Sequence, residues 1–210
     1  CWMKQEKTSQ KIRDTALELF SEHGYDSVSV GEIAAAVGIK APSLYNHFPC
    51  KQAIFDAIVE ATALLYERDT DRIDIHVQRA EKDVSLFRSI SQEMLFEKVY
   101  QIFEYSLHNE TICRFRKMMT IEQFRSPELR ALYTHRFVDR LVNYHAEIFR
   151  DLMAHGVIGK EDPEALALMY ISPVIALIGI CDREPEKEPL CVNRLKVHVR
   201  LFYEMVHKTA

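Results

Sequence analysis

The sequence predicts an all-α protein, and two observations carry that prediction. Apolar residues recur at helical spacing along almost the whole chain of 210 residues, and capping signals separate the segments. Glycine and proline are few, at six and seven, so that long helices are allowed. The nearest strand signal, at residues 74–77, is too short and isolated to build a sheet.

The N-terminal segment predicts two helices joined by a short loop. The first spans about residues 8–23 and ends at Gly24. One of its faces carries Ile12, Ala16, Leu19 and Phe20. The second is short: Ser29 and Glu32 form a capping box at its start, and Gly38 stops it.

Two further helices follow at once. The third begins near Lys40, with Pro42 in its first turn, and ends by Pro49. The fourth starts near Lys51 and continues through Leu65. The polar residues 69–88 are interpreted as the tail of the fourth helix plus a connector. More helices are predicted over residues 92–107, 110–125, 126–156, 162–182 and 190–207.

Composition excludes several classes of protein. A net charge of −4 means that any contact with nucleic acid has to come from a local patch, and the N-terminus offers one. Its cations are Lys4, Lys7, Lys11 and Arg13. Five cysteines without a CxxC motif favour free thiols in a reducing cytoplasm, and the polar N-terminus predicts no signal peptide.

The apolar run at residues 165–181 is predicted to be a buried helix and not a membrane span. It is 17 residues long, contains Pro173 in its middle, and has mostly acidic flanks. A helix that is apolar on all sides needs partners, and a dimer interface is a natural source of them.

Residues 29–47 have the pattern of a helix-turn-helix, and the second helix presents Lys40, Ser43, Asn46 and His47 outward. Side chains of this kind suit a recognition helix that enters the major groove of DNA. Tyr45 can contact the sugar-phosphate backbone, and Lys51 adds its charge at the start of the next helix.

This segment resembles the DNA-binding region of the TetR family over about the first quarter of the chain. The matching motifs are LF-x-x-x-GY at residues 19–25, SV-x-x-IA at 29–34, the turn VGI at 37–39, and LY-x-HF-x-x-K at 44–51. The motifs are weak one by one and specific together. The family is one of DNA-binding transcriptional regulators, mostly repressors.

The resemblance implies a role for each matching residue. Ser29 and the first turn of its helix would contact a phosphate, while Lys40, Ala41, Pro42 and Ser43 would face the bases. The backbone of the DNA would be held by Tyr45, His47 and Lys51. Two positions depart from the family pattern: Cys50 replaces a common Ser, a better N-cap, and Lys40 replaces a small hydroxyl residue.

For the rest of the chain the resemblance implies a DNA-binding domain at residues 1–52 and a body at 53–210 that senses a ligand and dimerises. The helices near 162–182 and 190–207 would pair with those of a second copy, so that two heads read half-sites of a palindromic double-stranded operator roughly 34 Å apart. The effector would be a small apolar or aromatic molecule. Candidate lining residues are Phe96, Tyr100, Phe103, Phe115, Met118, Met119, Phe124, Tyr133, Phe137, Tyr144 and Tyr170.

The two alternatives to a regulator are an enzyme and a helical adaptor that binds only protein. An enzyme is disfavoured because GxGxxG, GxSxG, P-loop and HExxH motifs are missing, and no cofactor is implied. His135, His145 and His155 recur every ten residues on one predicted helix, where they cannot form one metal site. A helical adaptor that binds only protein would leave the polar set around Lys40 unexplained.

Overall fold

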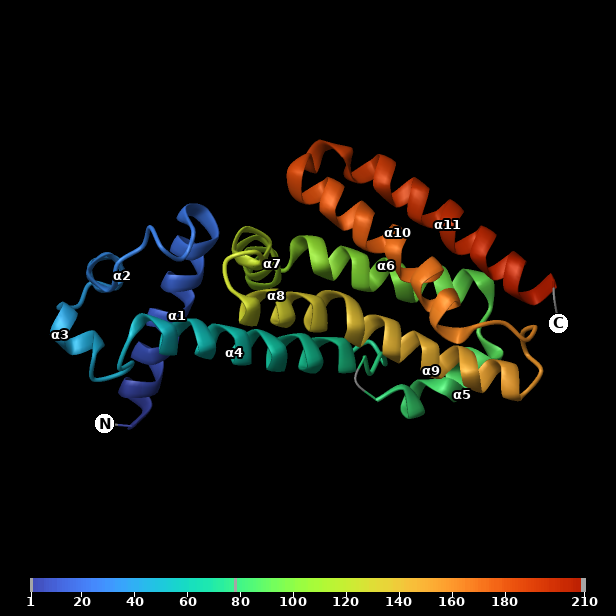
Figure 1. Ribbon diagram of the computed structural model, residues 1–210, viewed down its shortest axis with the longest axis horizontal. Helices are drawn as coiled ribbons and strands as arrows, with labels where there is room; N and C mark the ends of the chain where they lie inside the picture. The colour runs from blue at the N-terminus through green and yellow to red at the C-terminus, as the bar shows by residue number, and fades with distance from the viewer. Residues whose placement is uncertain (1, 78, 209–210) are drawn as a thin grey trace. The chain divides into compact units, whose positions relative to one another are not determined.

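The computed structural model describes residues 2–77 and 79–208, with side chains for residues 5–77 and 79–207. The described part of the chain is helical and contains no strand, which confirms the predicted class (Figure 1). It divides into two compact units. The first contains Cys1–Tyr66 together with Asn109–Leu132, and the second contains Glu67–His108 together with Tyr133–Ala210.

The first unit is built on α1, which packs against α2 and α7. Its helices are α1 (Trp2–His23), α2 (Val30–Val37), α3 (Ala41–Leu44), the first part of α4 (Lys51–Asp71) and α7 (Glu110–Glu122). Their apolar faces meet in a core in which Ile12, Phe20, Ile33, Leu44 and Met118 have no measurable exposure. Segment 109–132 is thus part of the first unit although 42 residues of the other unit precede it.

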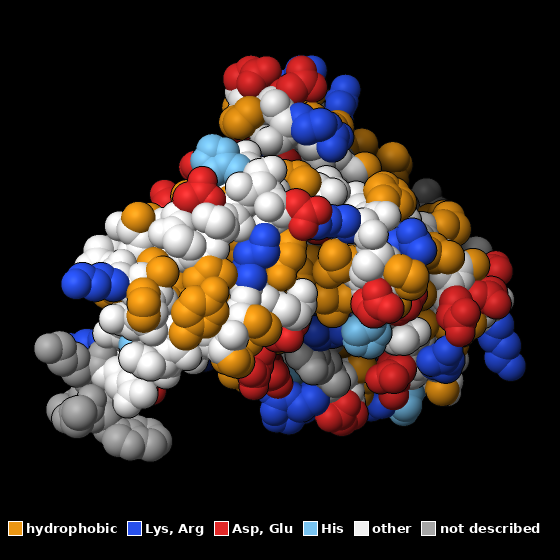
Figure 2. All heavy atoms as spheres, turned by 60° about the vertical axis from the view of Figure 1, so that its left-hand side comes forward, with side chains coloured by type: hydrophobic (Ala, Val, Ile, Leu, Met, Phe, Trp, Pro, Cys, Tyr) orange, Lys and Arg blue, Asp and Glu red, His pale blue; other side chains and the backbone are white. Residues whose placement is uncertain are grey.

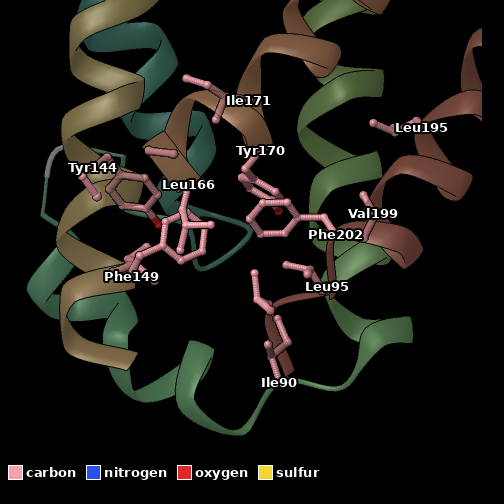
Figure 3. Packing of buried hydrophobic residues seen from close by; sticks show 14 of the residues in the cluster. Ile90, Leu95, Tyr144, Phe149, Leu166, Tyr170, Ile171, Leu195, Val199 and Phe202 are labelled. Carbon is pink, nitrogen blue, oxygen red and sulfur yellow. The ribbon is translucent and has the colours of Figure 1, made fainter. Parts of the chain in front are cut away.

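The second unit is a bundle in which α9 packs against α5 and α10, and α11 packs against α6 and α10. Its elements are α5 (Ala80–Ser89), α6 (Gln92–His108), a π-helical turn (His135–Asp139), α9 (Arg140–Ala154), α10 (Pro163–Arg183), a 3-10 turn (Pro185–Lys187) and α11 (Glu188–Lys208). α8 (Pro127–Thr134) begins in the first unit and ends in the second. Aromatic and branched side chains from α9, α10 and α11 converge in its core (Figure 3).

The predicted capping signals are present. The hydroxyl of Ser29 accepts the N–H of Glu32, whose carboxylate accepts the N–H of Ser29, and Gly38 ends α2 in the left-handed conformation. Asp162 caps α10 through the N–H of Ala165, with Pro163 in the first turn. Each cap satisfies backbone groups that the helix end leaves without a partner.

The interpretation of residues 69–88 as a helix tail and a connector was wrong beyond residue 79. α4 does end at Asp71, but α5 then forms over Ala80–Ser89. It has no side-chain cap at Arg79, so the usual start signal is missing. Smaller differences are that α1 begins at Trp2, that a π-helical turn interrupts the helix predicted over 126–156, and that α11 begins at Glu188.

α10 contains the apolar run. It is the one helix among the described residues that is long and apolar enough to cross a membrane, and a third of its most apolar window is buried within the chain. Tyr170 and Leu177 face the core, whereas Leu168 and Met169 are about half exposed, at 46% and 51%. A buried and an exposed apolar face therefore share one helix.

Candidate nucleic-acid interface and effector cavity

α2, the turn after it and α3 form the predicted helix-turn-helix. Gly38 has φ 83°, a value that favours glycine, and its N–H donates to the carbonyls of Ala34 and Ala35. The chain therefore turns sharply and starts α3 only a few residues after α2 ends. Leu44 of α3 is fully buried, which fixes the face that α3 turns to solvent.

The solvent face of α3 and the turn after it carries most of the predicted DNA-binding residues. Lys40, Pro42, Ser43, Tyr45 and Asn46 are exposed, while Ala41 lies at intermediate exposure. Tyr45 is 52% exposed although it is a large aromatic residue. Polar and aromatic groups on such a short helix are suited to base edges and to the sugar-phosphate backbone.

Ser29 stands at the N-terminus of α2, where free backbone N–H groups favour an anion. Its side chain is exposed and is held by Glu32, with Oγ 2.7 Å from a carboxylate oxygen. The hydrogen bonds from Ser29 lower the pKa of Glu32. A carboxylate already occupies part of this helix end, so a phosphate could reach it only beside Glu32.

Three of the basic or polar groups predicted for DNA make contacts within the head. His47 shares a 2.9 Å hydrogen bond with the hydroxyl of Ser9, and Lys11 donates to the carbonyl of Val37 at 2.8 Å. Lys51 donates to the carbonyls of Tyr25 and Val28 at 2.8 and 2.9 Å. These hydrogen bonds hold the helices and turns of the head together. The side chain of Lys4 lies outside the described residues.

Basic side chains do not form one continuous patch on the face drawn in Figure 2, where Lys and Arg are interspersed with Asp and Glu. With a net charge of −4, broad electrostatic attraction to DNA is weak. Recognition then has to depend on the local set on α3 and on backbone amides.

The second unit contains a small, partly open cavity of about 30 Å³, enough for one or two water molecules. It lies between α5, α6, α9, α10 and α11, and aromatic rings make up much of its wall. The lining residues are Phe87, Ile90, Leu95, His145, Ile148, Phe149, Leu152, Ile158, Tyr170, Phe202, Tyr203, Val206 and His207. Figure 3 shows Phe149, Tyr170 and Phe202 turned toward one another.

His145 is the most informative group in this wall. Burial lowers its pKa to about 4, so the ring is neutral near pH 7. Its Nδ1 lies 2.8 Å from the carbonyl of Leu141, which can only accept, so Nδ1 carries the hydrogen. Nε2 is therefore a hydrogen-bond acceptor. Burial also raises the pKa of Tyr170, which keeps its hydroxyl neutral.

The predicted lining residues are spread over both units. Phe115, Met118 and Met119 are buried in the core of the first unit, where Phe124 is 76% exposed. Phe96, Tyr100, Phe103, Tyr133, Phe137 and Tyr144 belong to the second unit but do not line the cavity. Tyr170 is the predicted residue that does, and its ring is tilted by 47° against that of Phe202, with ring centroids 4.9 Å apart.

Sequence reasoning missed His145, Phe149 and Phe202 as cavity residues. Phe149 and Phe202 fall at ordinary helical core spacing, so nothing in the sequence separates them from other buried aromatics. The spacing of His135, His145 and His155 excludes one shared metal site and indicates surface or pocket-edge histidines, but it does not single out His145. No group of His, Cys, Asp and Glu able to hold a metal occurs among the residues that the structure describes.

Comparison with known proteins agrees with the geometry of the head. Residues 12–58 match the family model for bacterial regulatory proteins of the tetR family. The negative transcriptional regulator IcaR of the biofilm operon icaADBC, from Staphylococcus aureus, is 48% identical over 50 residues. That match covers 24% of this chain and 27% of IcaR, so it concerns the head alone.

Solved structures match the whole chain at lower identity. A structure described as a TetR-family transcriptional regulator from Mesorhizobium loti has a TM-score of 0.68 at 18% identity, covering 97% of this chain and 98% of that one. A complex of SmeT with triclosan has a TM-score of 0.65 at 23% identity, covering 95% and 89%. These likenesses establish the fold.

Proposed function

We propose that this chain, which belongs to the tetR family of bacterial regulatory proteins, is a dimeric repressor that binds a palindromic DNA operator and is released by a small molecule. The family consists of transcriptional regulators and not of enzymes. The observation that carries the proposal is the exposed set on α3 and at its two ends: Lys40, Ser43, Tyr45 and Asn46 all face solvent. Repression is favoured by IcaR, a negative regulator whose head is 48% identical.

A dimer through α10 and α11 is supported by their exposed apolar residues. On α10 these are Leu168, Met169 and Ile175, and on α11 they are Leu190, Val197, Leu201 and Met205, each between 36% and 53% exposed. On α11 these residues are seven, four and four positions apart and form a stripe along the helix, and on α10 Leu168 and Ile175 are seven positions apart on one face. Exposed stripes of this kind on neighbouring helices favour burial against the same helices of a second copy. A soluble cytoplasmic dimer follows, and it gives the apolar α10 a partner other than lipid.

The cavity is the proposed effector site. Its apolar wall, with a neutral acceptor at Nε2 of His145 and a neutral hydroxyl at Tyr170, favours an uncharged aromatic molecule that donates one hydrogen bond. Such a molecule needs more room than about 30 Å³, so its binding has to move the lining helices apart. That movement is the proposed signal. The SmeT neighbour, seen with triclosan, makes a chlorinated phenol a sensible first probe.

The test is selection of bound sequences from a random double-stranded DNA pool at near-physiological salt. We expect an enriched palindrome with half-sites about one helical turn apart. Replacing Asn46 by Ala should relax the choice of base at particular positions, while Glu60→Ala, on an exposed part of α4 away from α3, should select the same site. No enrichment by the wild-type protein, before and after unfolding and refolding to strip bound molecules, would refute DNA recognition.

The proposed release by a small molecule is tested with the operator that the selection enriches. Triclosan should lower operator occupancy of the wild-type protein, and His145→Phe, which removes the acceptor but keeps an aromatic ring, should weaken that response. If triclosan and related phenols bind the wild-type protein and the His145→Phe variant with equal affinity, the cavity is not their binding site.

A further inference from the structure

The turn between α1 and α2, residues 24–28, leads directly into Ser29. Gly24 begins it with φ 81°, a left-handed value that reverses the chain after α1. A Cβ at Gly24 would lie 3.3 Å from Oε1 of Glu122. The turn is therefore packed closely against the end of α7, almost 100 residues later in the sequence.

Glu122 makes two hydrogen bonds at this contact although it is only 3% exposed. One carboxylate oxygen accepts the backbone N–H of Tyr25 at 2.8 Å, and the other accepts from Arg125 at 2.5 Å. Arg125 also pairs with Asp26, and its guanidinium lies 5.3 Å from the ring centroid of Tyr25. A buried carboxylate is costly unless it is paired in this way.

Lys51 holds the same turn from α4. Its ammonium donates to the carbonyls of Tyr25 and Val28 and lies 4.2 Å from the centre of the Tyr25 ring. The turn is thus fixed by groups from α4 and from the end of α7. Ser29, which follows the turn, and Lys51, which contacts it, are both residues predicted to contact phosphate. An error in the position of the turn would displace both.

We propose that Glu122 and Arg125 are positioning residues for DNA binding: they hold residues 24–28 so that Ser29 and Lys51 face the phosphate backbone together. The proposal rests on the proposed function. Neither residue lies in the segment that matches the family model, residues 12–58, and both come from segment 109–132, which the sequence alone placed in the ligand-sensing body. Their effect on DNA is indirect, through the turn.

The experiment compares Glu122→Ala and Glu122→Gln with a matched control, Arg114→Gln. Arg114 lies on α7 as well, and it pairs with Glu18 of α1 at 3.0 Å and with Glu110 at 2.8 Å, both of which lie outside residues 24–28. Each variant is measured for melting temperature, for the fraction of active protein by stoichiometric titration with the selected operator, and for operator affinity of that active fraction at several salt concentrations. Hydrogen exchange of the Tyr25 amide is followed in parallel.

We expect Glu122→Ala to weaken operator binding by roughly tenfold or more, and Glu122→Gln, whose amide oxygen can still accept from Tyr25, to fall between it and the wild type. The salt dependence should become flatter, by up to about one unit, because Lys51 is no longer held against a phosphate. The Tyr25 amide should exchange faster in Glu122→Ala and not in Arg114→Gln. A residue that only stabilised the fold would lower the melting temperature and leave the affinity of the active fraction intact.

The proposal is overturned if folded Glu122→Ala binds the operator within about twofold of the wild type, or if the Tyr25 amide is as protected as before. If Glu122→Ala does not fold, the test uses Glu122→Gln. The proposal is then overturned if Glu122→Gln binds the operator with the affinity and the salt dependence of the wild type. Failure of the wild-type protein to select any DNA is a different outcome, since it refutes the proposed function itself.

Discussion

Replacing Asp83 by Ala should strongly destabilise the second unit. Asp83 lies on α5 and is 2% exposed. Its carboxylate accepts the backbone N–H of His76 at 2.7 Å and the ring Nδ1 of His76 at 2.6 Å. It also accepts a short hydrogen bond from the hydroxyl of Tyr144 on α9. One side chain therefore joins the 72–79 connector, α5 and α9.

The magnitude follows from which of these donors can find water. The side chain of His76 is 21% exposed, so its ring can be solvated after the change. The Tyr144 hydroxyl, on a residue only 5% exposed, would be left without its acceptor. Removing one partner from a buried charged cluster costs about 3–5 kcal/mol, whereas Tyr144→Phe, which removes a single bond and its donor, should cost about 1–2 kcal/mol.

The assay is urea unfolding followed by far-UV circular dichroism at neutral pH. Hydrogen exchange of peptides from residues 72–89 would assign the loss to the second unit, because two compact units need not unfold together. A loss of this size corresponds to a melting temperature lower by roughly 6–20 °C. Glu147→Ala, on an exposed position of α9, is the control and should change stability by less than about 0.5 kcal/mol.

The Asp83 reasoning is refuted if Asp83→Ala costs less than about 1 kcal/mol. It is equally refuted if Asp83→Ala and Tyr144→Phe are additive in the double variant, because residues that share a hydrogen bond should show coupling.

Three further changes test other parts of the molecule. Lys51→Ala should weaken binding to all DNA sequences and flatten the salt dependence by about one unit; an unchanged slope with weaker binding would mean that Lys51 acts only by bracing the 24–28 turn. Leu201→Glu, on the exposed apolar stripe of α11, should shift the protein from dimer to monomer in sedimentation, and Arg200→Glu on the neighbouring exposed position should not. The pKa of His145, about 4 when folded against about 6.5 when unfolded, means that the unfolded chain takes up its proton first. Wild-type stability should therefore fall between pH 6.5 and 4 by about 3 kcal/mol relative to His145→Phe, and parallel stability curves for the two proteins would contradict the buried neutral ring.

The sequence was sufficient for the head because its signals are local. Ser29 with Glu32, and Gly38 after the last apolar residue, act within a few positions of one another, so their pattern predicts the turn directly. α5 was missed because its start has no capping side chain at Arg79. It is held instead by Asp83, whose partner Tyr144 lies 61 residues away.

The lining of the candidate effector cavity could be predicted only in part, for a physical reason. Aromatic residues at helical spacing are buried whether they line a cavity or fill a core. Phe103, which was predicted to line a cavity, has no measurable exposure, while Tyr170, predicted on the same grounds, lines one. The difference is set by which helices meet, and spacing along one helix does not contain that information.

Because segment 109–132 belongs to the first unit, it affects how hybrids between such proteins should be designed. The contacts that join it to the first 66 residues include three between polar groups: Arg114 to Glu18, Glu122 to Tyr25 and Arg125 to Asp26. A hybrid made by cutting the chain once, after the helix-turn-helix, would graft a foreign head onto this segment and separate each residue from its native partner. A hybrid that moves residues 1–66 and 109–132 together would keep all three. The unit of exchange between relatives is therefore discontinuous, and recombination designs need two crossover segments in place of one.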